Sequence, residues 1–160
     1  MDWHEITDRY HGQSLEADGD LATLSEDWQR ELAALWRLEA DVNNGGYLQF
    51  INNWGLDTFT YSLAGLRKIR AHKMAALVEE CQSLVERHTD GNLPESERFQ
   101  NLMPNPILNS DGTSTTPPPS PIPDEVLQKI DELSYQFMAY PDDIATLGIA
   151  YYSTKFASEG

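Results

Sequence analysis

Three side chains near the start of the chain have the types and the spacing of a metal site. His4, Asp8 and His11 follow one another at steps of four and three residues, so a helical segment would place them on one face. Imidazole and carboxylate groups are common ligands of divalent metals. A structural zinc site also needs a fourth ligand and supporting hydrogen-bond partners, which no nearby residue supplies. We therefore expect a solvated face here, and the sequence predicts neither a metal nor a cofactor.

Amide side chains crowd a second stretch, residues 43–55, which reads NNGGYLQFINNWG. Amides are poor acids, bases and nucleophiles, so this composition favours a structural corner that holds other groups in place. Two adjacent glycines allow a left-handed helix end and a sharp turn, and the amides are expected to satisfy buried helix-end groups. A ligand-binding pocket formed by the amides is the alternative. The residues assigned to the corner are Asn44, Gly45, Gly46, Gln49 and Asn53.

Carboxylates give the chain its strongest compositional signal, because 26 acidic residues stand against 11 basic ones, for a net charge of −15. Residues 1–43 and 89–160 each hold 11 acidic and 3 basic residues, whereas residues 44–88 hold 4 and 5. Such a field repels nucleic acids and anionic membranes and attracts basic protein surfaces. We therefore expect no direct binding to nucleic acid and no membrane association. The charge could equally serve solubility alone.

The acidic residues expected to contact a partner fall into two blocks. One precedes and opens a predicted helix near residues 25–44, and the other lies in the last third of the chain. Adjacent acids on a helix point in different directions and are ordinarily solvated, so they predict electrostatic contacts and no acid–base pair. The candidate contacts are Asp18, Asp20, Glu26 and Asp27 in the first block, and Asp124, Glu125, Asp131, Glu132, Asp142 and Asp143 in the second.

Helical periodicity dominates the chain and strand alternation is nearly absent, so helices must position these groups. Thr23 with Glu26 fits a capping box for one helix, and Trp54-Gly55 separates two others. The sequence predicts an all-α fold: a single compact helical domain over residues 1–160, with about six to eight helices. The apolar spacing places helices near residues 2–16, 25–44, 46–53, 57–69, 71–88, 123–139 and 142–151.

The composition changes between residues 103 and 124, where seven prolines surround the polar run NSDGTSTT. Proline removes backbone donors and the polar run has nothing to bury, so residues 104–123 are predicted to form a long loop before the last two helices. A spacer is the favoured interpretation of this loop, and an SH3-type ligand at residues 117–119 is the alternative.

The sequence also lacks the features of an exported or membrane-spanning protein. Its first ten residues, MDWHEITDRY, have neither the basic nor the apolar region of a signal peptide, and no apolar run approaches the ~18 residues that cross a bilayer. The single cysteine, Cys81, cannot form an internal disulfide and lies in a helical pattern as a small buried hydrophobe. We therefore expect a cytoplasmic protein.

The amide-rich corner also resembles a family signature. From position 44 it reads Asn-Gly-Gly-aromatic-x-Gln-aromatic, after a helix that contains Glu39 and before two further helices. This pattern resembles the signature of the bacterial DNA-mimic protein family, over about residues 25–110 and more loosely over 127–135. The resemblance implies an all-helical fold, a homodimer and a basic DNA-binding protein as partner, because the family's characterised member is an acidic dimer that occupies the DNA-binding face of a transcriptional repressor.

Charge and resemblance together predict an acidic protein-binding module that offers carboxylates in place of phosphates to a transcription regulator. Such mimicry predicts carboxylates on one face at ~6–7 Å, the spacing of phosphates along a DNA strand. Two alternatives remain: an immunity protein that neutralises a basic toxin, and a small enzyme with a pocket near Gln49 and Asn53. The enzyme requires a titratable group with a perturbed pKa in a cleft, and the sequence predicts no catalytic residue.

Overall fold

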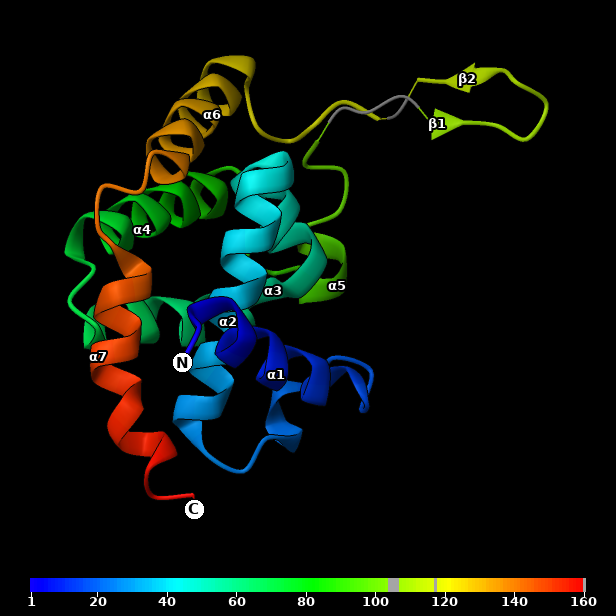
Figure 1. Ribbon diagram of the computed structural model, residues 1–160. Coiled ribbons are helices and arrows are strands. Elements are labelled where there is room, and N and C mark those ends of the chain that lie inside the picture. The colour runs from blue at the N-terminus through cyan, green and yellow to red at the C-terminus, as the bar shows by residue number, and fades with distance from the viewer. Residues whose placement is uncertain (104–106, 117, 160) are drawn as a thin grey trace.

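The computed structural model describes residues 1–103, 107–116 and 118–159, and its architecture is a set of packed helices (Figure 1). The all-α prediction is confirmed, as is the place of the Pro-rich segment before the last two helices. Within the described ranges no helix is both long and apolar enough to cross a membrane. The helices are α1 (Trp3–Leu15), the short 3-10 helix η1 (Leu21–Thr23), α2 (Asp27–Gly45), α3 (Tyr47–Lys68), α4 (His72–Arg87), α5 (Glu95–Arg98), α6 (Asp124–Met138) and α7 (Ile144–Phe156).

Helix α2 is the element against which α1, α3 and α6 pack. Leu32, Leu35, Leu38 and Val42 follow at steps of three and four residues and form a buried stripe along it. Burying each of these aliphatic side chains stabilises the fold by about 1.5–3 kcal/mol before conformational entropy is counted. The central place of α2 explains why its polar residues take part in most of the buried hydrogen bonds described below.

The start of α2 differs from the predicted start. The side chain of Gln29 accepts a hydrogen bond from the backbone N–H of Glu26 at 3.2 Å, so the capping box joins these two residues. The sequence offered Thr23 or Ser25 as the cap, but Thr23 belongs to η1, which Asp20 caps. Two capping signals follow one another here, and the sequence pattern alone does not show which of them begins the long helix.

Helix α3 consists of two segments that meet at Gly55. This residue has φ 74° and ψ −166°, outside the helical region, so the predicted break at Trp54-Gly55 is confirmed. The N–H of Leu56, at the start of the second segment, donates to the carboxylate of Glu95 in α5 at 2.6 Å. A Cβ at position 55 would lie 2.0 Å from a carboxylate oxygen of Glu95, whose exposed side chain would have to move, while the positive φ favours glycine whatever the space.

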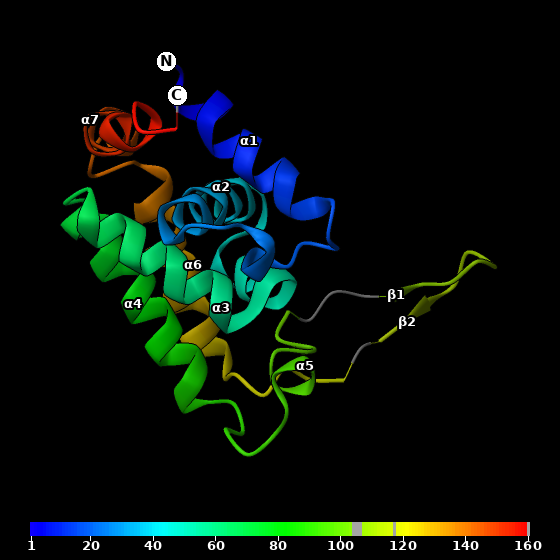
Figure 2. The ribbon, with the colours of Figure 1, turned by 90° about the horizontal axis from the view of Figure 1, so that it is seen from below.

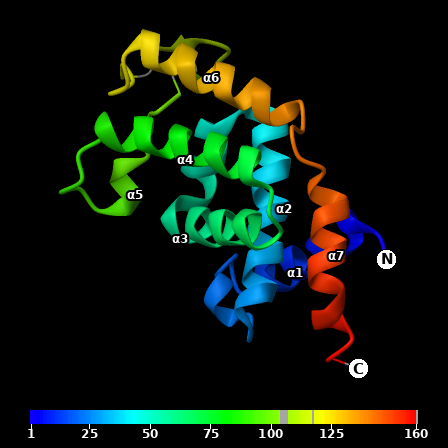
Figure 3. The same ribbon diagram turned by 90° about the vertical axis from the view of Figure 1, so that its left-hand side faces the viewer.

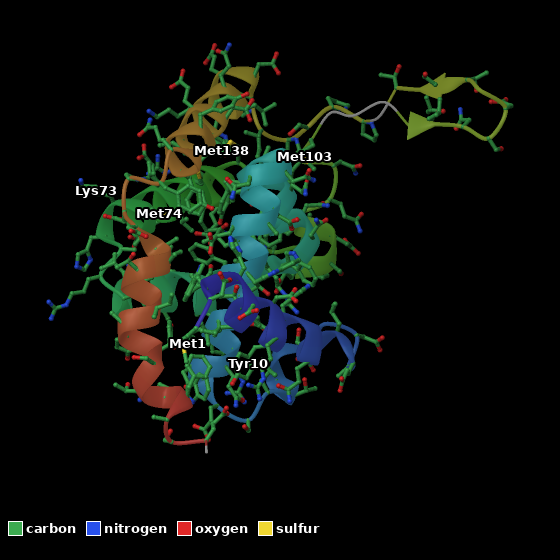
Figure 4. All side chains as sticks on the ribbon, in the orientation of Figure 1. Met1, Tyr10, Lys73, Met74, Met103 and Met138 are labelled. Atoms are coloured by element: carbon green, nitrogen blue, oxygen red, sulfur yellow. The ribbon has the colours of Figure 1, made fainter. Side chains whose placement is uncertain are left out.

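Helix α6 packs against α4 and α2, while α7 lies beside α1 (Figure 3). Tyr10 of α1, labelled in Figure 4, packs edge-on against Trp28 of α2 and stacks with Phe156 of α7. The carboxylate of Glu159 accepts hydrogen bonds from the Tyr10 hydroxyl at 2.9 Å and from the Gln29 amide at 2.7 Å. These contacts fix the C-terminal end of α7 against α1 and α2.

The Pro-rich segment contains a short hairpin that the sequence did not predict. Strand β1 (Ile107–Leu108) pairs antiparallel with β2 (Ser114–Thr115), and the hairpin projects from the helices (Figure 2). The Asn109 amide donates to the hydroxyls of Thr113 at 3.0 Å and Thr115 at 2.8 Å. The hairpin depends on these local hydrogen bonds, which composition does not reveal, so the sequence indicated only a loop.

The two ends of the predicted loop are joined at the helical body. The hydroxyl of Ser120 donates to the backbone carbonyl of Leu102 at 2.8 Å. Leu102 and Ile122 are both buried. Residues 104–106 and 117, which include part of the predicted loop and of the SH3-type alternative, lie outside the described residues.

Candidate functional site

The carboxylate of Asp41 is the centre of the amide-rich corner. One of its oxygens accepts a hydrogen bond from the Gln49 amide at 3.0 Å. The other accepts from the Asn53 amide at 3.1 Å and from the Trp54 indole N–H at 2.8 Å. The Gln49 oxygen in turn accepts from the Asn44 amide at 3.3 Å. The amides therefore hold a carboxylate of the preceding helix and do not satisfy helix-end groups, which corrects the sequence-based expectation for their partners.

The glycines before this centre let α2 and α3 meet at close range. Gly46 has φ 84° and ψ 179°, a conformation that is essentially confined to glycine. At Gly45 a Cβ would lie 1.9 Å from the side-chain oxygen of Gln49. The backbone N–H of Tyr47 donates to the hydroxyl of Ser134 in α6 at 3.0 Å, so a third helix closes the corner.

Arg37 lies one helical turn before Asp41 and is 1% exposed. Burial lowers the pKa of its guanidinium to about 10, and the negative charge of Asp41 opposes that shift. All of its hydrogen-bond acceptors are neutral, and the indole of Trp54 covers one of its faces. The contacts are His11 Nδ1 at 3.3 Å, Thr58 Oγ1 at 3.1 Å, Ser14 Oγ at 2.8 Å, the Gly19 carbonyl at 2.8 Å, and the centre of the Trp54 ring at 3.9 Å.

His4, Asp8 and His11 do not share the solvated face that the sequence analysis expected, because His11 is buried. His4 and Asp8 are exposed, whereas His11 is buried and stacks on Trp36 with ring centres 3.8 Å apart. Burial and then the positive charge of Arg37 lower the pKa of His11 to about 4, so its ring is neutral near pH 7. Across the described residues no three His, Cys, Asp or Glu side chains are arranged to hold a metal ion.

Glu39 forms a second polar centre, which the sequence analysis did not single out as a site residue. Its side chain is 7% exposed and accepts hydrogen bonds from the Trp3 indole at 2.7 Å and the Tyr140 hydroxyl at 2.9 Å. The Asn43 amide donates to the same hydroxyl at 2.8 Å. Burial raises the pKa of the Glu39 carboxyl, and the two hydrogen bonds and the charge of His4 act against that shift.

A cavity of about 240 Å³ lies beside this carboxylate, and we call it the Glu39 pocket. Its lining comes from α1, α2 and the turn between α6 and α7, where Tyr140 has a left-handed φ of 49°. The sequence could have indicated Glu39 as a site residue, since it follows Leu38 in the apolar repeat of α2 and a buried charge requires partners. The lining residues are His4, Thr7, Trp36, Glu39, Ala40, Asn43 and Tyr140.

The first predicted acidic block and the α6 part of the second lie near opposite ends of α2. The first block surrounds its start at Asp27, and the second begins in α6, whose Ser134 meets the chain just beyond the end of α2. A helix of 19 residues is about 28 Å long, so the structure separates the first block from the carboxylates of α6. The second block is itself divided, because Asp124 opens α6 whereas Asp142 and Asp143 follow its far end, about 20 Å along the helix axis.

Five of the ten candidate carboxylates take part in local structure. Those of α6, by contrast, have no hydrogen-bond or ion-pair partner among the described residues, and that of Asp18 in the turn after α1 has none either. The residues with local roles are Asp20, which caps η1, Glu26 in the capping box of α2, Asp27, paired with Arg30 at 2.6 Å, Asp142, bonded to the N–H of Met74 at 2.9 Å, and Asp143, which caps α7. The α6 residues are Asp124, Glu125, Asp131 and Glu132.

Comparison with protein families identifies the chain over most of its length. The sequence model of the family described as DMP19-like protein matches residues 22–155, which include α2 to α6 and all but the last residue of α7. Comparisons with curated proteins and with solved structures found no match. The family match corrects the resemblance to the bacterial DNA-mimic protein family, because the matching family is a different one, and the dimer inferred from that resemblance loses its support. The chain belongs to the DMP19-like protein family.

Proposed function

We propose that this protein is an acidic protein-binding module that docks a basic surface of another protein on the outward side of α6. The observation that carries the proposal is the pairing, on that helix, of four unpartnered carboxylates with an exposed aromatic residue. Tyr135 is 70% exposed, more than any other aromatic side chain among the described residues. Aromatic residues are enriched at protein interfaces, so an exposed ring beside four acids favours a binding surface.

The helix geometry arranges these groups on one side. Asp124, Asp131 and Tyr135 follow at steps of seven and four residues and share a stripe, with Glu125 and Glu132 on the neighbouring stripe. A single lysine is the only basic residue of the helix. Exposed ion pairs contribute only ~0–1 kcal/mol each, so the acids would mainly steer and orient the partner. The tyrosine would supply apolar contact area, because aromatic residues are enriched at the centres of interfaces.

Two kinds of basic partner fit this surface: a DNA-binding transcription regulator and a toxin that is neutralised by binding. The carboxylate pairs of α6 repeat one heptad apart, about 10 Å along the helix axis. This repeat exceeds the ~6–7 Å between phosphates along a DNA strand. The spacing therefore favours contacts with individual Lys and Arg side chains over imitation of a phosphate backbone.

The first acidic block, the single cysteine and the amide-rich corner contribute less to the proposal than α6 does. The first acidic block, at the other end of α2, adds long-range attraction without direct contact. The single cysteine is compatible with action in the cytoplasm, as the sequence predicts. The enzyme alternative expects a pocket near Gln49 and Asn53, and a cavity of about 210 Å³ does lie beside Asn53, although Gln49 does not line it. The amides of Gln49 and Asn53 both donate to Asp41, so they support a structural role at the corner.

The test compares two variants that lose the same number of negative charges. The α6 variant carries Asp124→Asn, Glu125→Gln, Asp131→Asn and Glu132→Gln. Its control neutralises four exposed carboxylates elsewhere, through Glu5→Gln, Asp8→Asn, Glu16→Gln and Asp57→Asn. A protein retained from cell lysate by the wild type at low salt is identified and purified, and its affinity for each variant is measured by calorimetry at several salt concentrations.

The proposal expects the α6 variant to lose about tenfold or more in affinity, which is about 1.4 kcal/mol, while the control changes little. Tyr135→Ala, which alters no charge, should also weaken binding. Release of the partner by duplex DNA would identify it as a DNA-binding protein. Equal losses in the two charge variants, or undiminished binding by the α6 variant, would reject α6 as the docking surface.

A further inference from the structure

Helix α2 carries two buried carboxylates, Glu31 and Glu39, whose surroundings differ. Glu31 is 1% exposed, accepts a hydrogen bond from the Tyr152 hydroxyl at 2.9 Å and forms an ion pair with the ammonium group of Lys68. Glu39, eight residues later, also accepts from a tyrosine hydroxyl, that of Tyr140, at 2.9 Å. It has no basic side chain within ion-pair distance among the described residues, and it lines an open cavity.

A buried carboxylate without a counter-ion is costly, because hydrogen bonds from neutral donors replace only part of its lost hydration. The donors to Glu39 are one indole and one phenol, and each oxygen retains capacity for a further hydrogen bond. Burial raises the pKa of this carboxyl, while the charge of His4, which lines the same cavity without forming an ion pair, acts against that shift. A cation in the cavity would complete the site as Lys68 completes that of Glu31.

The walls of the Glu39 pocket suit a small organic cation. Trp36 lines one wall, and its indole is held by the ring of His11, which stacks on it at 3.8 Å with an interplanar angle of 9°. The phenol of Tyr140 and the methyl group of Ala40 complete the less polar part. Aromatic rings around a carboxylate are a usual combination for binding alkylammonium groups. At about 240 Å³ the cavity is smaller than sites for drug-sized ligands, which indicates a single head group.

We propose that the Glu39 pocket binds the ammonium group of a primary amine, with the Glu39 carboxylate as its counter-ion and Trp36 and Tyr140 against the attached methylene groups. The amine could be a free small molecule or the side chain of a lysine presented by another protein. The proposal rests on α1, α2 and Tyr140, and is therefore independent of docking on α6.

The experiment titrates the isotope-labelled protein with three probes and follows the indole N–H resonances of its four tryptophans by NMR. The probes are n-butylamine, its uncharged analogue n-butanol, and a terminally blocked peptide Ala-Ala-Lys-Ala-Ala. Trp3 donates to Glu39 and Trp36 lines the pocket, so their resonances should shift with the amines. Trp28 and Trp54, which do not line the pocket, serve as internal controls.

Variants separate the carboxylate from the shape of the cavity. Glu39→Gln removes the charge, and Ala40→Leu fills the cavity from its partly exposed rim while leaving the carboxylate in place. Each should weaken binding of butylamine about tenfold or more. Glu31→Gln is the matched control, because it neutralises the other buried carboxylate of α2, and it should leave amine binding unchanged. Ala40→Leu keeps the test decisive if Glu39→Gln does not fold.

The probes also distinguish the two sources of the amine. Peptide binding about tenfold tighter than that of butylamine would assign the pocket to a lysine of a protein partner, and equal or weaker binding would assign it to a free amine. The proposal is overturned if neither amine shifts Trp3 and Trp36, if butanol binds as tightly as butylamine, or if Glu39→Gln and Ala40→Leu bind amines like the wild type. None of these results depends on a protein docked at α6.

Discussion

The carboxylate of Asp41 accepts a hydrogen bond from the indole N–H of Trp54 at 2.8 Å. The face of the same indole lies 3.9 Å from the guanidinium carbon of Arg37. One side chain of α3 thus contacts both the anion and the cation that α2 presents one turn apart. The amide-rich corner therefore has a structural role in joining α2 and α3, since its polar groups form hydrogen bonds with one another.

Replacement of Asp41 by asparagine should destabilise the fold by about 1–3 kcal/mol. The charge-assisted hydrogen bonds are lost, and the NH2 group of the new amide would face the donors of Gln49, Asn53 or Trp54. The loss of negative charge near the buried Arg37 acts in the same direction. Urea denaturation provides the measurement, with the exposed Asp57→Asn as control. Similar stabilities of the two variants would show that the Asp41 contacts do not stabilise the corner.

Replacement of Gly46 by valine should destabilise the protein by ~1 kcal/mol or more, because its φ of 84° with ψ of 179° is accessible essentially to glycine alone. Gly91→Val is the matched control, since position 91 lies in an exposed turn where an added Cβ would meet nothing within 4 Å. The thermal midpoints of both variants are to be compared with that of the wild type. An unchanged midpoint for Gly46→Val would contradict the proposed requirement for glycine.

The sequence predicted the long helices and the break at Gly55 because periodicity, capping residues and glycine act locally, whereas the short η1 and α5 were not predicted. It did not predict the partners of Asp41 or Glu39. Glu39 and Tyr140 are 101 positions apart, and Glu31 and Tyr152 are 121 apart. Periodicity indicates that the face of α2 with Glu31 and Glu39 is buried. Which tyrosines contact these two carboxylates depends on how α6 and α7 pack against α2.

Acid should weaken the fold through His11. Its pKa in the folded protein is about 4, against an ordinary value of 6.5, so the unfolded chain takes up a proton that the folded protein excludes. The stabilising contribution is complete above pH 6.5 and is lost as the pH falls from 6.5 towards 4. The loss should be on the order of 2–3 kcal/mol.

Urea denaturation between about pH 3 and pH 7.5, a range that brackets both pKa values, measures this effect. His11→Gln, which retains an acceptor for Arg37, should show a smaller loss of stability over the range than the wild type. His72→Gln, at an exposed position, should follow the wild type. A pH dependence that is unaffected by His11→Gln would assign the acid sensitivity to other groups.

Cys81 should be nearly inert towards thiol reagents in the folded protein. Burial, and then the negative charge of Glu80, raise the pKa of its thiol to about 12, so little thiolate forms at pH 8. Alkylation by iodoacetamide should therefore be slow in buffer and fast in denaturing urea, with mass spectrometry as the readout. Rapid alkylation without denaturant would show that α4 opens readily.

The hydrogen bond between Ser120 and Leu102 joins the two ends of the segment that contains the hairpin. The closure entropy of a chain segment grows slowly with its length, by about 0.6 kcal/mol for each doubling. Peptide grafted between Asn109 and Thr113 would consequently be displayed beyond the helical body at small energetic cost. The tip is thus the part of this architecture where new sequence can be tried without rebuilding either the acidic helix or the amine pocket.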